Sequence, residues 1–277
     1  MSYKIIIDSG CDIDENIKNN QNICQVPLKI CIGDEEFLDD DHLDTVQLLN
    51  RMKNSPEPPR TASPSPQDFL EKYDGEEKIF VVTLSSKLSS TFQHAVMAKK
   101  MYLQEKRDKF IHIFDSMSAS VGGALVSMKI QELIKDNNSE TVIVEKVNQY
   151  IKNLKTLFVL ESLENLIKSG RINKLVGKIA SVLSIKPIMG GVDGQISLVE
   201  QVRGSKKALR RLVDLIGELG ENLEDKVLGI AHCNCLEKAE HFKNEVLKKY
   251  NFKDIIIVPT KGVCTVYANE GGIIIAF

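Results

Sequence analysis

The 277-residue sequence contains no tryptophan and only 6% aromatic residues, and it has no excess of charge of either sign. Its 36 lysines and arginines against 38 aspartates and glutamates give a formal net charge of −2. This balance argues against nucleic acid or an anionic membrane surface as a partner. No apolar run is long enough to cross a bilayer, so we expect no stable membrane insertion.

Features of exported and metal-binding proteins are also missing. The N-terminus enters a strand pattern at once, without the plan of a signal peptide, which predicts a cytoplasmic location. None of the six cysteines forms a Cys-x-x-Cys pair. Cys233 and Cys235 follow His232 without the second pair that a zinc finger needs. We interpret the cysteines as free thiols of a reducing compartment and expect no metal and no cofactor.

Two catalytic signatures are absent. There is no Gly-x-Ser-x-Gly nucleophile elbow, and the glycine-rich run 190–194 lacks the pattern of a phosphate-binding loop. A serine hydrolase that uses Ser89 or Ser90 with His94 is still an alternative, although the other roles of a catalytic triad are unfilled. A binding protein for another small anionic ligand is a second alternative.

Residues 78–95 form the stretch around which the rest of the chain can be organised. Ile79–Thr83 is apolar and β-branched, as in a strand buried on both faces. A helical pattern follows, with Phe92, Val96 and Met97 on one side. The hydroxyl residues in between can cap this helix, whose free N–H groups and dipole favour an anion. The stretch therefore predicts a place for a carboxylate or a phosphate.

Strands alternate with helices through the first half, which predicts a parallel sheet with helices on both faces. The predicted strands are Lys4–Ile7, Ile23–Ile32, Ile79–Thr83 and Phe110–Phe114, and the predicted helices are Thr45–Lys53, Gln67–Tyr73, Ser118–Lys135 and Thr141–Leu154. Ligands collect beyond the carboxyl ends of such strands, where Asp8-Ser9, Ser85–Thr91 and Asp115-Ser116 lie. We interpret Asp12 or Asp14 as the cap of a helix after the first strand.

The second half mixes hairpins with crossovers, which predicts an α+β domain on a mixed sheet. Its predicted strands are Thr156–Leu160, Ser184–Met189, Gln195–Val202, Val227–Ala231, Ile255–Val258 and Ile273–Phe277, and its predicted helices are Glu161–Lys168, Lys206–Leu219 and Leu236–Tyr250. The sequence thus predicts an α/β chain of two domains, 1–155 and 156–277.

The segment 54–66 is rich in proline, which excludes a helix or a central strand. Within it, Arg60–Ser65 carries several hydroxyls on a backbone that the prolines hold extended. A helix follows at once, which argues against a solvated linker.

Together these segments resemble the DegV family over essentially the whole chain. The resemblance lies in the order and spacing of Asp8-Ser9, Thr61–Pro66, Ser85–Phe92, Asp115-Ser116 with Ser120, Gly122 and Gly123, Ser169–Ile172, and Lys186–Ile188. It implies a two-domain α/β fold with one long-chain fatty acid in a buried tunnel between the domains. It also implies a carrier without chemistry of its own, which presents the acyl carboxylate to a fatty acid kinase for phosphorylation.

The resemblance further implies the site of the head group. The family holds the carboxylate on the Thr of a Thr-x-x-Pro-Ser segment and the Ser of a Leu-Ser-x-Thr segment, which are Thr61 and Ser89 here. Arg171 is expected at an exposed turn, where its guanidinium suits an anionic phosphate. The expected ligand-binding residues are Thr61, Ser63, Ser89, Ser90, Thr91, Ser116, Arg171 and Thr265.

Two positions depart from the family pattern. Ser90 stands where the family usually has glycine after the binding serine. When the C-terminal family pattern Gly-Thr-His-x-Gly-Pro-Gly is started at Cys264, its histidine falls on Val266. We therefore expect Thr265, Tyr267 or Asn269 to replace the lost polar group.

Overall fold

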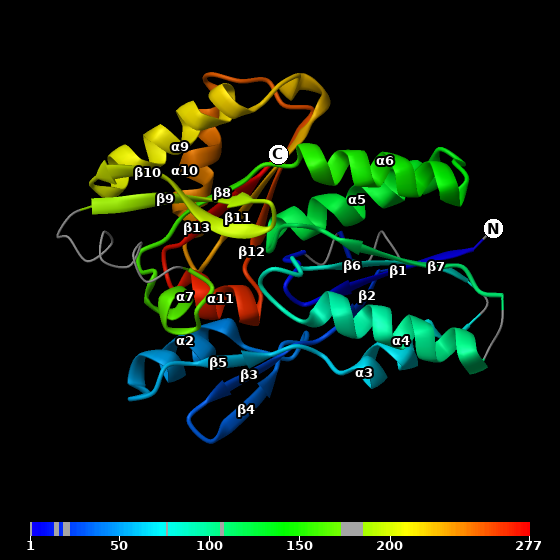
Figure 1. Cartoon of the computed structure of the whole chain (residues 1–277). Helices are drawn as coiled ribbons and strands as arrows, with labels where there is room; N and C mark the ends of the chain where they lie inside the picture. The colour runs from blue at the N-terminus through cyan, green and yellow to red at the C-terminus, as the bar shows by residue number, and fades with distance from the viewer. Residues whose placement is uncertain (1, 14–16, 19–22, 76, 106–107, 173–184) are drawn as a thin grey trace.

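The computed structural model of the protein describes residues 2–13, 17–18, 23–75, 77–105, 108–172 and 185–277. Its first half contains a parallel sheet in the order β2-β1-β6-β7. The strands are β1 (Tyr3–Asp8), β2 (Ile23–Val26), β6 (Lys78–Thr83) and β7 (Ile111–Asp115). Helices α3 (Pro66–Tyr73) and α4 (Thr91–Glu105) cover one face, and α5 (Val121–Lys135) and α6 (Glu140–Asn153) cover the other (Figure 1). The predicted fold of this half is confirmed.

Strand β6 shows why the central strands read as continuous apolar runs. Ile79 and Val81 pack in the cluster under α3 and α4, whereas Phe80 and Val82 pack in the cluster under α5 and α6. Alternate side chains of a strand point to opposite faces, so a sheet covered on both sides needs apolar residues at every position.

The second half forms a mixed sheet in the order β10-β9-β8-β13-β11-β12. Its strands are β8 (Thr156–Val159), β9 (Ile185–Val192), β10 (Gln195–Arg203), β11 (Val227–His232), β12 (Asp254–Pro259) and β13 (Ile273–Ala276). Strands β11 and β12 run parallel, and the other paired neighbours run antiparallel. Helices α9 (Ser205–Leu219) and α10 (Leu236–Leu247) pack on this sheet, with a short 3₁₀ turn at Leu223–Asp225 before β11. The predicted mixed sheet is confirmed.

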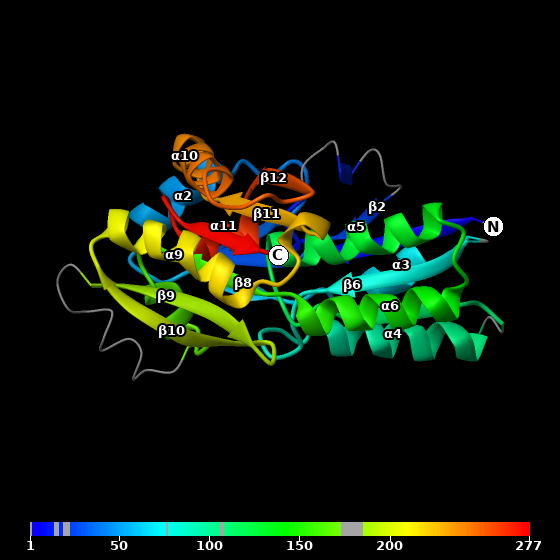
Figure 2. The ribbon, with the colours of Figure 1, turned by 90° about the horizontal axis from the view of Figure 1, so that it is seen from above.

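Helix α5 lies between the two larger sheets. Its residues Val121 and Leu125 share one core cluster with Ile7 of β1 and with Ala231 and Ala276 of the second sheet. Figure 2 shows the two sheets side by side, with α5 reaching from one to the other. A division of the chain at residue 155 stays a prediction.

A small third sheet, in the order β4-β3-β5, corrects the prediction of one long strand at Ile23–Ile32. The chain leaves the first sheet at Pro27 and enters β3 (Lys29–Ile32), because proline cannot donate to a strand ladder. Strand β4 (Glu35–Leu38) completes a hairpin through Gly33, whose φ of 58° suits glycine. Helix α2 (Thr45–Asn54) follows this hairpin.

The proline-rich segment contains β5 (Arg60–Ala62), which pairs with β3 so that Thr61 lies opposite Ile30. A sheet edge, and not a linker, therefore holds Thr61 in place.

Three further predictions need correction. The buried residues of α4 are Thr91, Ala95, Ala98 and Tyr102, whereas Met97, predicted on the same side as Phe92 and Val96, is 51% exposed. The small alanines let α4 pack closely on its neighbours. Helix α7 (Glu164–Lys168) begins three residues later than predicted. Helix α11 (Gly262–Ala268) was not predicted at all, because no polar cap or apolar period marks it. The predicted strand start at Ser184 lies outside the described residues.

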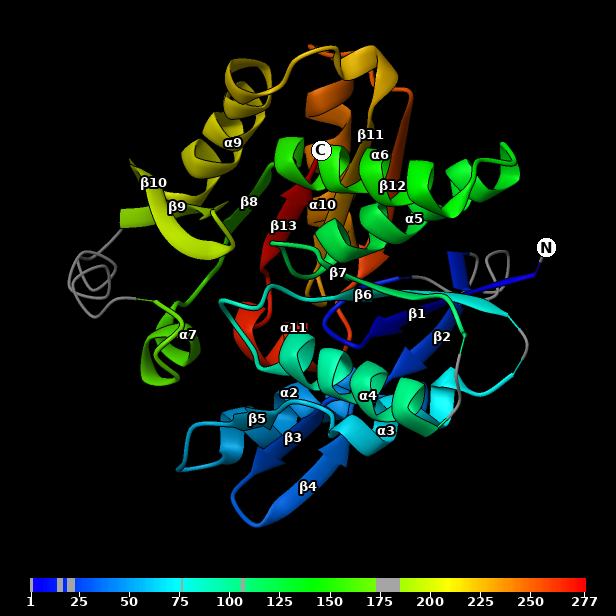
Figure 3. The same ribbon diagram turned by 45° about the vertical axis from the view of Figure 1, so that its right-hand side comes forward.

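Helix α11 runs next to α2, below the second sheet and beside the first (Figure 3). Among the described residues, no helix combines the length and the apolar character that crossing a membrane requires.

Candidate functional site

A cavity of about 300 Å³ lies where the carboxyl ends of β1, β6 and β7 approach the second sheet and α11. This volume falls within the range of about 300–1,000 Å³ that small-molecule sites occupy. Apolar side chains make up much of its lining, among them Leu28, Leu84, Leu88, Phe158, Leu160, Leu166, Ile196, Val263 and Ile274. The site therefore forms at the sheet end where the sequence placed it.

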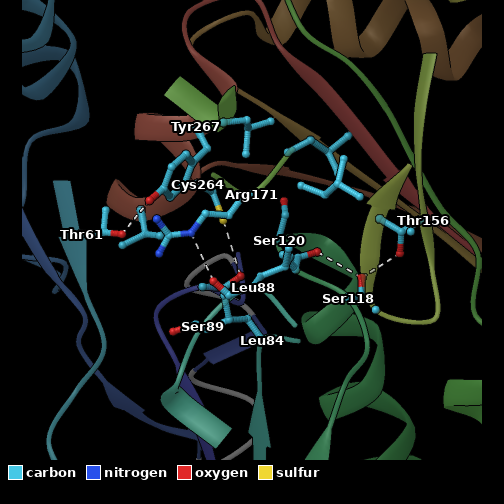
Figure 4. Close-up of a pocket in the computed structure, with 18 of the residues that line it drawn as sticks. Thr61, Leu84, Leu88, Ser89, Ser118, Ser120, Thr156, Arg171, Cys264 and Tyr267 are labelled. Atoms are coloured by element: carbon cyan, nitrogen blue, oxygen red, sulfur yellow. Dashed lines mark hydrogen bonds between the residues drawn. The ribbon is translucent and has the colours of Figure 1, made fainter. Parts of the chain in front are cut away.

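One part of the lining is a group of hydroxyl side chains, Thr61, Ser63, Ser89, Ser90 and Tyr267, which we call the hydroxyl cluster. Thr61 Oγ1 lies 2.7 Å from Tyr267 Oη (Figure 4). Ser63 Oγ lies 2.7 Å from Ser90 Oγ. Four separate elements supply the cluster: β5, the segment after it, the start of α4, and α11. It offers several hydrogen-bond donors to an anion within a small space.

Ser89 has a role in local structure as well. Its Oγ accepts a hydrogen bond from the backbone N–H of Thr91 at 3.3 Å and lies 2.8 Å from Thr91 Oγ1. Thr91 is the first residue of α4, so Ser89 covers part of that free N-terminus. The predicted cap and the predicted ligand residue are therefore the same side chain.

Arg171 is the one charged side chain among the described residues that line the cavity. Its Nε donates to the Leu88 carbonyl at 3.3 Å, and one Nη donates to the Ser169 carbonyl at 3.1 Å. The guanidinium lies 5.7 Å from the centre of the Tyr267 ring. No carboxylate in the described part of the chain pairs with this guanidinium, which favours an anionic ligand beside it. Arg171 is half-buried, which corrects its predicted place at an exposed turn.

Three buried aspartates hold the backbone that surrounds the cavity. The Asp8 carboxylate accepts hydrogen bonds from the N–H groups of Gly10 and Leu84, both at 2.8 Å. Asp12 accepts from Lys261 N at 2.6 Å and from Ser120 Oγ at 2.5 Å. Asp12 thus binds partners distant in sequence, whereas the start of the helix that it was predicted to cap lies outside the described residues. Asp14 lies outside the described residues.

Asp39, the third of these residues, anchors α11. Its two oxygens accept from the N–H groups of Gly262 at 2.6 Å and Val263 at 2.8 Å. A Cβ at position 262 would lie 2.6 Å from Asp39 Oδ1, so only glycine permits this close approach. Since α11 carries Cys264 and Tyr267 into the cavity, Asp39 positions part of the site without lining it.

Burial perturbs these carboxyl groups. It raises the pKa of Asp8 and of Asp12 to about 7, and the pKa of Asp39 to about 6, while the hydrogen bonds that each accepts lower the pKa. No group of three or more His, Cys, Asp or Glu side chains in the described part of the chain has the arrangement of a metal site. The carboxylate oxygens of Asp8, Asp12 and Asp39 instead accept hydrogen bonds from N–H and O–H donors.

Comparisons with known proteins decide the family. A family model described as "Uncharacterised protein, DegV family COG1307" matches residues 2–277. The chain belongs to the DegV family. A DegV domain-containing protein of Streptococcus gordonii is 34% identical over 280 residues, covering 100% of this chain and 99% of that protein.

Solved DegV structures share the fold over their whole length. A DegV family protein from Ruminococcus gnavus with vaccenic acid has a TM-score of 0.96 and 41% identity, covering 100% of this chain and 99% of that one. The Streptococcus pneumoniae Fatty Acid Kinase (Fak) B3 protein loaded with linoleic acid has a TM-score of 0.93 and 34% identity, with the same coverage. A DegV family protein from Eubacterium eligens with heptadecanoic acid has a TM-score of 0.93 and 29% identity, covering 99% of each chain.

Five of the eight residues expected from the DegV resemblance line the cavity: Thr61, Ser63, Ser89, Ser90 and Arg171. The other three do not. Thr91 is fully buried at the start of α4, Ser116 Oγ donates to the Ser118 carbonyl, and Thr265 Oγ1 lies 2.7 Å from Thr260 Oγ1. Each of these hydroxyls belongs to the internal structure of a turn or helix.

The structure places Val266, on which the histidine of the C-terminal DegV pattern was put, away from the cavity. Val266 is fully buried among Leu28, Ile30 and Leu48 and does not line the cavity, whereas the next residue, Tyr267, does. Moving the pattern by one residue puts its histidine on Tyr267 and its last glycine on Gly271, whose φ is +86°. The middle glycine then falls on Asn269, which also has a positive φ of 56°.

Sequence reasoning did not assign several cavity residues to the site, namely Met117, Ser118, Ser120, Thr156, Gly191 and Cys264, although Ser120 and Cys264 stand in the quoted motifs. Ser118 and Ser120 lie beside the predicted Asp115-Ser116 motif, which offered a signal. Nothing in the sequence marked Thr156 or Cys264 as a cavity residue. Thr156 lies at the start of a strand, and Cys264 lies on a helix that was not predicted.

The geometry at His94 bears on the hydrolase alternative. His94 Nδ1 lies 2.6 Å from the Pro64 carbonyl oxygen and 3.3 Å from Ser63 Oγ. A carbonyl oxygen only accepts, so Nδ1 carries a hydrogen and donates it there. In that tautomer Nδ1 is unable to take a proton from Ser63 or Ser90.

Proposed function

We propose that this chain binds one long-chain fatty acid in the cavity and presents its carboxylate to a fatty acid kinase for phosphorylation. The observation that carries the proposal is the described lining, in which apolar side chains surround the hydroxyl cluster and one cation, Arg171, that pairs with none of the described carboxylates. Relatives that share the fold carry vaccenic, linoleic and heptadecanoic acids. The cavity would lie between the proposed domains 1–155 and 156–277.

The apolar part of the cavity would supply most of the affinity. Each buried methylene contributes about 0.8 kcal/mol, so a long acyl chain gains on the order of 10 kcal/mol before ordering costs. The hydroxyl cluster would then fix the orientation of the ligand. We place the carboxylate on Thr61 and Ser89, with Tyr267 and Arg171 beside it.

The test is to identify what the purified protein retains. We expect organic extraction and mass spectrometry of protein expressed in bacteria to yield about one long-chain fatty acid per chain. A bound nucleotide or sugar, or a protein that neither retains nor takes up fatty acid, would contradict the proposal and favour another small anionic ligand.

The proposed protein is a carrier and not a hydrolase. Among the described residues, no serine hydroxyl is hydrogen-bonded to Nε2 of His94 and no carboxylate is bonded to its imidazole, so the roles of a catalytic triad stay unfilled. A chromogenic ester should therefore remain intact during incubation with the protein. Hydrolysis of the ester by the parent protein that is lost in Ser90→Ala would instead support the hydrolase alternative.

Removing one head-group hydroxyl should weaken binding and spare the fold. We expect Thr61→Val and Ser89→Ala each to cost about 1.5–3 kcal/mol of fatty acid affinity, because each loses a hydrogen bond to a charged group. Titration with a fluorescent fatty acid measures this loss. Ser65→Ala is a matched control, since Ser65 caps α3 and does not line the cavity. Unchanged fatty acid affinity in both test variants would mean that the carboxylate binds elsewhere in the protein.

Arg171 should matter more for phosphorylation than for binding. With a fatty acid kinase and saturating fatty acid, we expect Arg171→Ala to slow acyl phosphate formation about tenfold or more, while affinity falls less. The physical reason is that the guanidinium would stabilise the negative charge on the oxygens of the phosphoryl group as it is transferred to the carboxylate. Lys168→Ala is the control, because Lys168 is exposed and pairs with Glu164. Full phosphorylation of the Arg171 variant would refute this role.

A further inference from the structure

The cavity carries a second polar group, apart from the hydroxyl cluster. Ser118, in the loop before α5, and Thr156, at the start of β8, both line the cavity, and their hydroxyl oxygens lie 2.7 Å apart. Figure 4 shows this pair on the side of the cavity away from Thr61 and Tyr267. An unsubstituted acyl chain has no use for hydroxyls there, because methylene groups make no hydrogen bonds to them.

The pair has hydrogen-bonding capacity left over. Ser118 Oγ also lies 3.3 Å from the Ala119 carbonyl oxygen, which accepts its hydrogen when Thr156 donates to Ser118. When Ser118 donates to Thr156 instead, the hydrogen of Thr156 is free. In both arrangements Thr156 Oγ1 retains unused capacity, since Ser118 is its one side-chain partner among the described residues.

Two glycines determine where there is room beside this pair. A Cβ at Gly122 would lie 2.0 Å from Ser118 Oγ, so that side is closed. A Cβ at Gly191 would meet nothing nearer than Thr156 Cβ, at 3.7 Å. The cavity therefore has open space beside Thr156 on the Gly191 side, where Thr156 Oγ1 lies more than 4 Å from the Cβ position.

We propose that Ser118 and Thr156 form a subsite for a hydroxyl group on the acyl chain, so that the protein prefers hydroxylated long-chain fatty acids to unsubstituted ones. The inference rests on the proposed function, because the carboxylate must first lie at the hydroxyl cluster. A ligand hydroxyl both donates and accepts, so it completes the bonding of Thr156 in either arrangement. The space beside Gly191 accommodates the branch. The distance from the hydroxyl cluster to Thr156 selects which carbon carries the hydroxyl.

The test is competition against a fluorescent fatty acid, with stearate and a set of hydroxystearates that differ in the position of the hydroxyl. We expect one positional isomer to bind about fivefold to tenfold more tightly than stearate, as one net hydrogen bond provides. In Thr156→Val this order should reverse, because valine has a similar shape and leaves the ligand hydroxyl unpaired.

Thr260→Val is the matched control. Thr260 and Thr265 form a buried hydroxyl pair with the same 2.7 Å separation, outside the cavity, so this variant should keep the preference for the hydroxylated isomer. If neither stearate nor any isomer binds, the proposed function itself fails. If stearate binds but no isomer is preferred, or if the preference survives in Thr156→Val, the subsite alone is refuted.

Discussion

Replacing Gly191 with phenylalanine should abolish fatty acid binding, with affinity lowered more than about 100-fold, because the new side chain occupies the ligand volume. Gly191 lines the cavity from β9, and a Cβ there meets only Thr156 Cβ at 3.7 Å and Met117 O at 3.9 Å. Its φ is not positive, so the backbone accepts a larger residue without strain. Titration with a fluorescent fatty acid measures the loss.

Val192→Phe is the control for this experiment. Val192 follows Gly191 on the same strand, so its side chain points to the opposite face, and it is 54% exposed. Both variants should keep a free energy of unfolding within about 1 kcal/mol of the parent, as surface substitutions and filled cavities usually do. Normal binding by a folded Gly191→Phe protein would mean that the acyl chain does not use this cavity.

Replacing Asp39 with alanine should lower the free energy of unfolding by about 2–6 kcal/mol. The variant leaves the N–H groups of Gly262 and Val263 buried without an acceptor, and each such group costs about 1–3 kcal/mol. Because these groups begin α11, fatty acid affinity should fall as well, through Tyr267. Urea unfolding followed by circular dichroism suits a chain without tryptophan.

Asp41→Ala separates the effect of Asp39 from a general loss of negative charge. Asp41 is 46% exposed and forms ion pairs with Lys18 and Lys261, so its loss should cost about 1 kcal/mol at most. Asp39→Asn should fall between the two alanine variants, since an amide oxygen still accepts one hydrogen bond. Equal stability of the Asp39 and Asp41 alanine variants would show that α11 does not depend on this carboxylate.

The predictions for Gly191 and Asp39 concern two different parts of the site. One part contacts the ligand, and the other holds the contacting residues in place. Gly191 belongs to the cavity wall, whereas Asp39 acts only through α11. A variant of the wall should change binding at constant stability, and a variant of the support should change both. Measuring binding and unfolding in parallel therefore tests the whole arrangement.

The local sequence was sufficient for the central strands of the first sheet, although not for its edge strand β2. Continuous apolar runs such as Ile79–Thr83 identified its central strands, and polar residues after Asp8, Thr83 and Asp115 marked the edge where the cavity lies. Parallel strands bring their carboxyl ends to one edge whatever the details of packing, so period and order along the chain were enough. Thr61 and Ser89 were also recognised from short motifs, and both line the cavity.

Tertiary structure alone decided which side chains meet. Thr61 and Tyr267 are 206 positions apart in the sequence, Asp39 and Gly262 are 223 apart, and Ser118 and Thr156 are 38 apart. No local period encodes such pairs, because they depend on how three sheets and α11 pack together. For the same reason, the sequence did not indicate which of Val266 and Tyr267 faces the cavity. Val266 packs in the core, and Tyr267 lines the cavity. The sequence identified the types of residue that form the site, and the packing of the sheets and helices brought these residues together around one cavity.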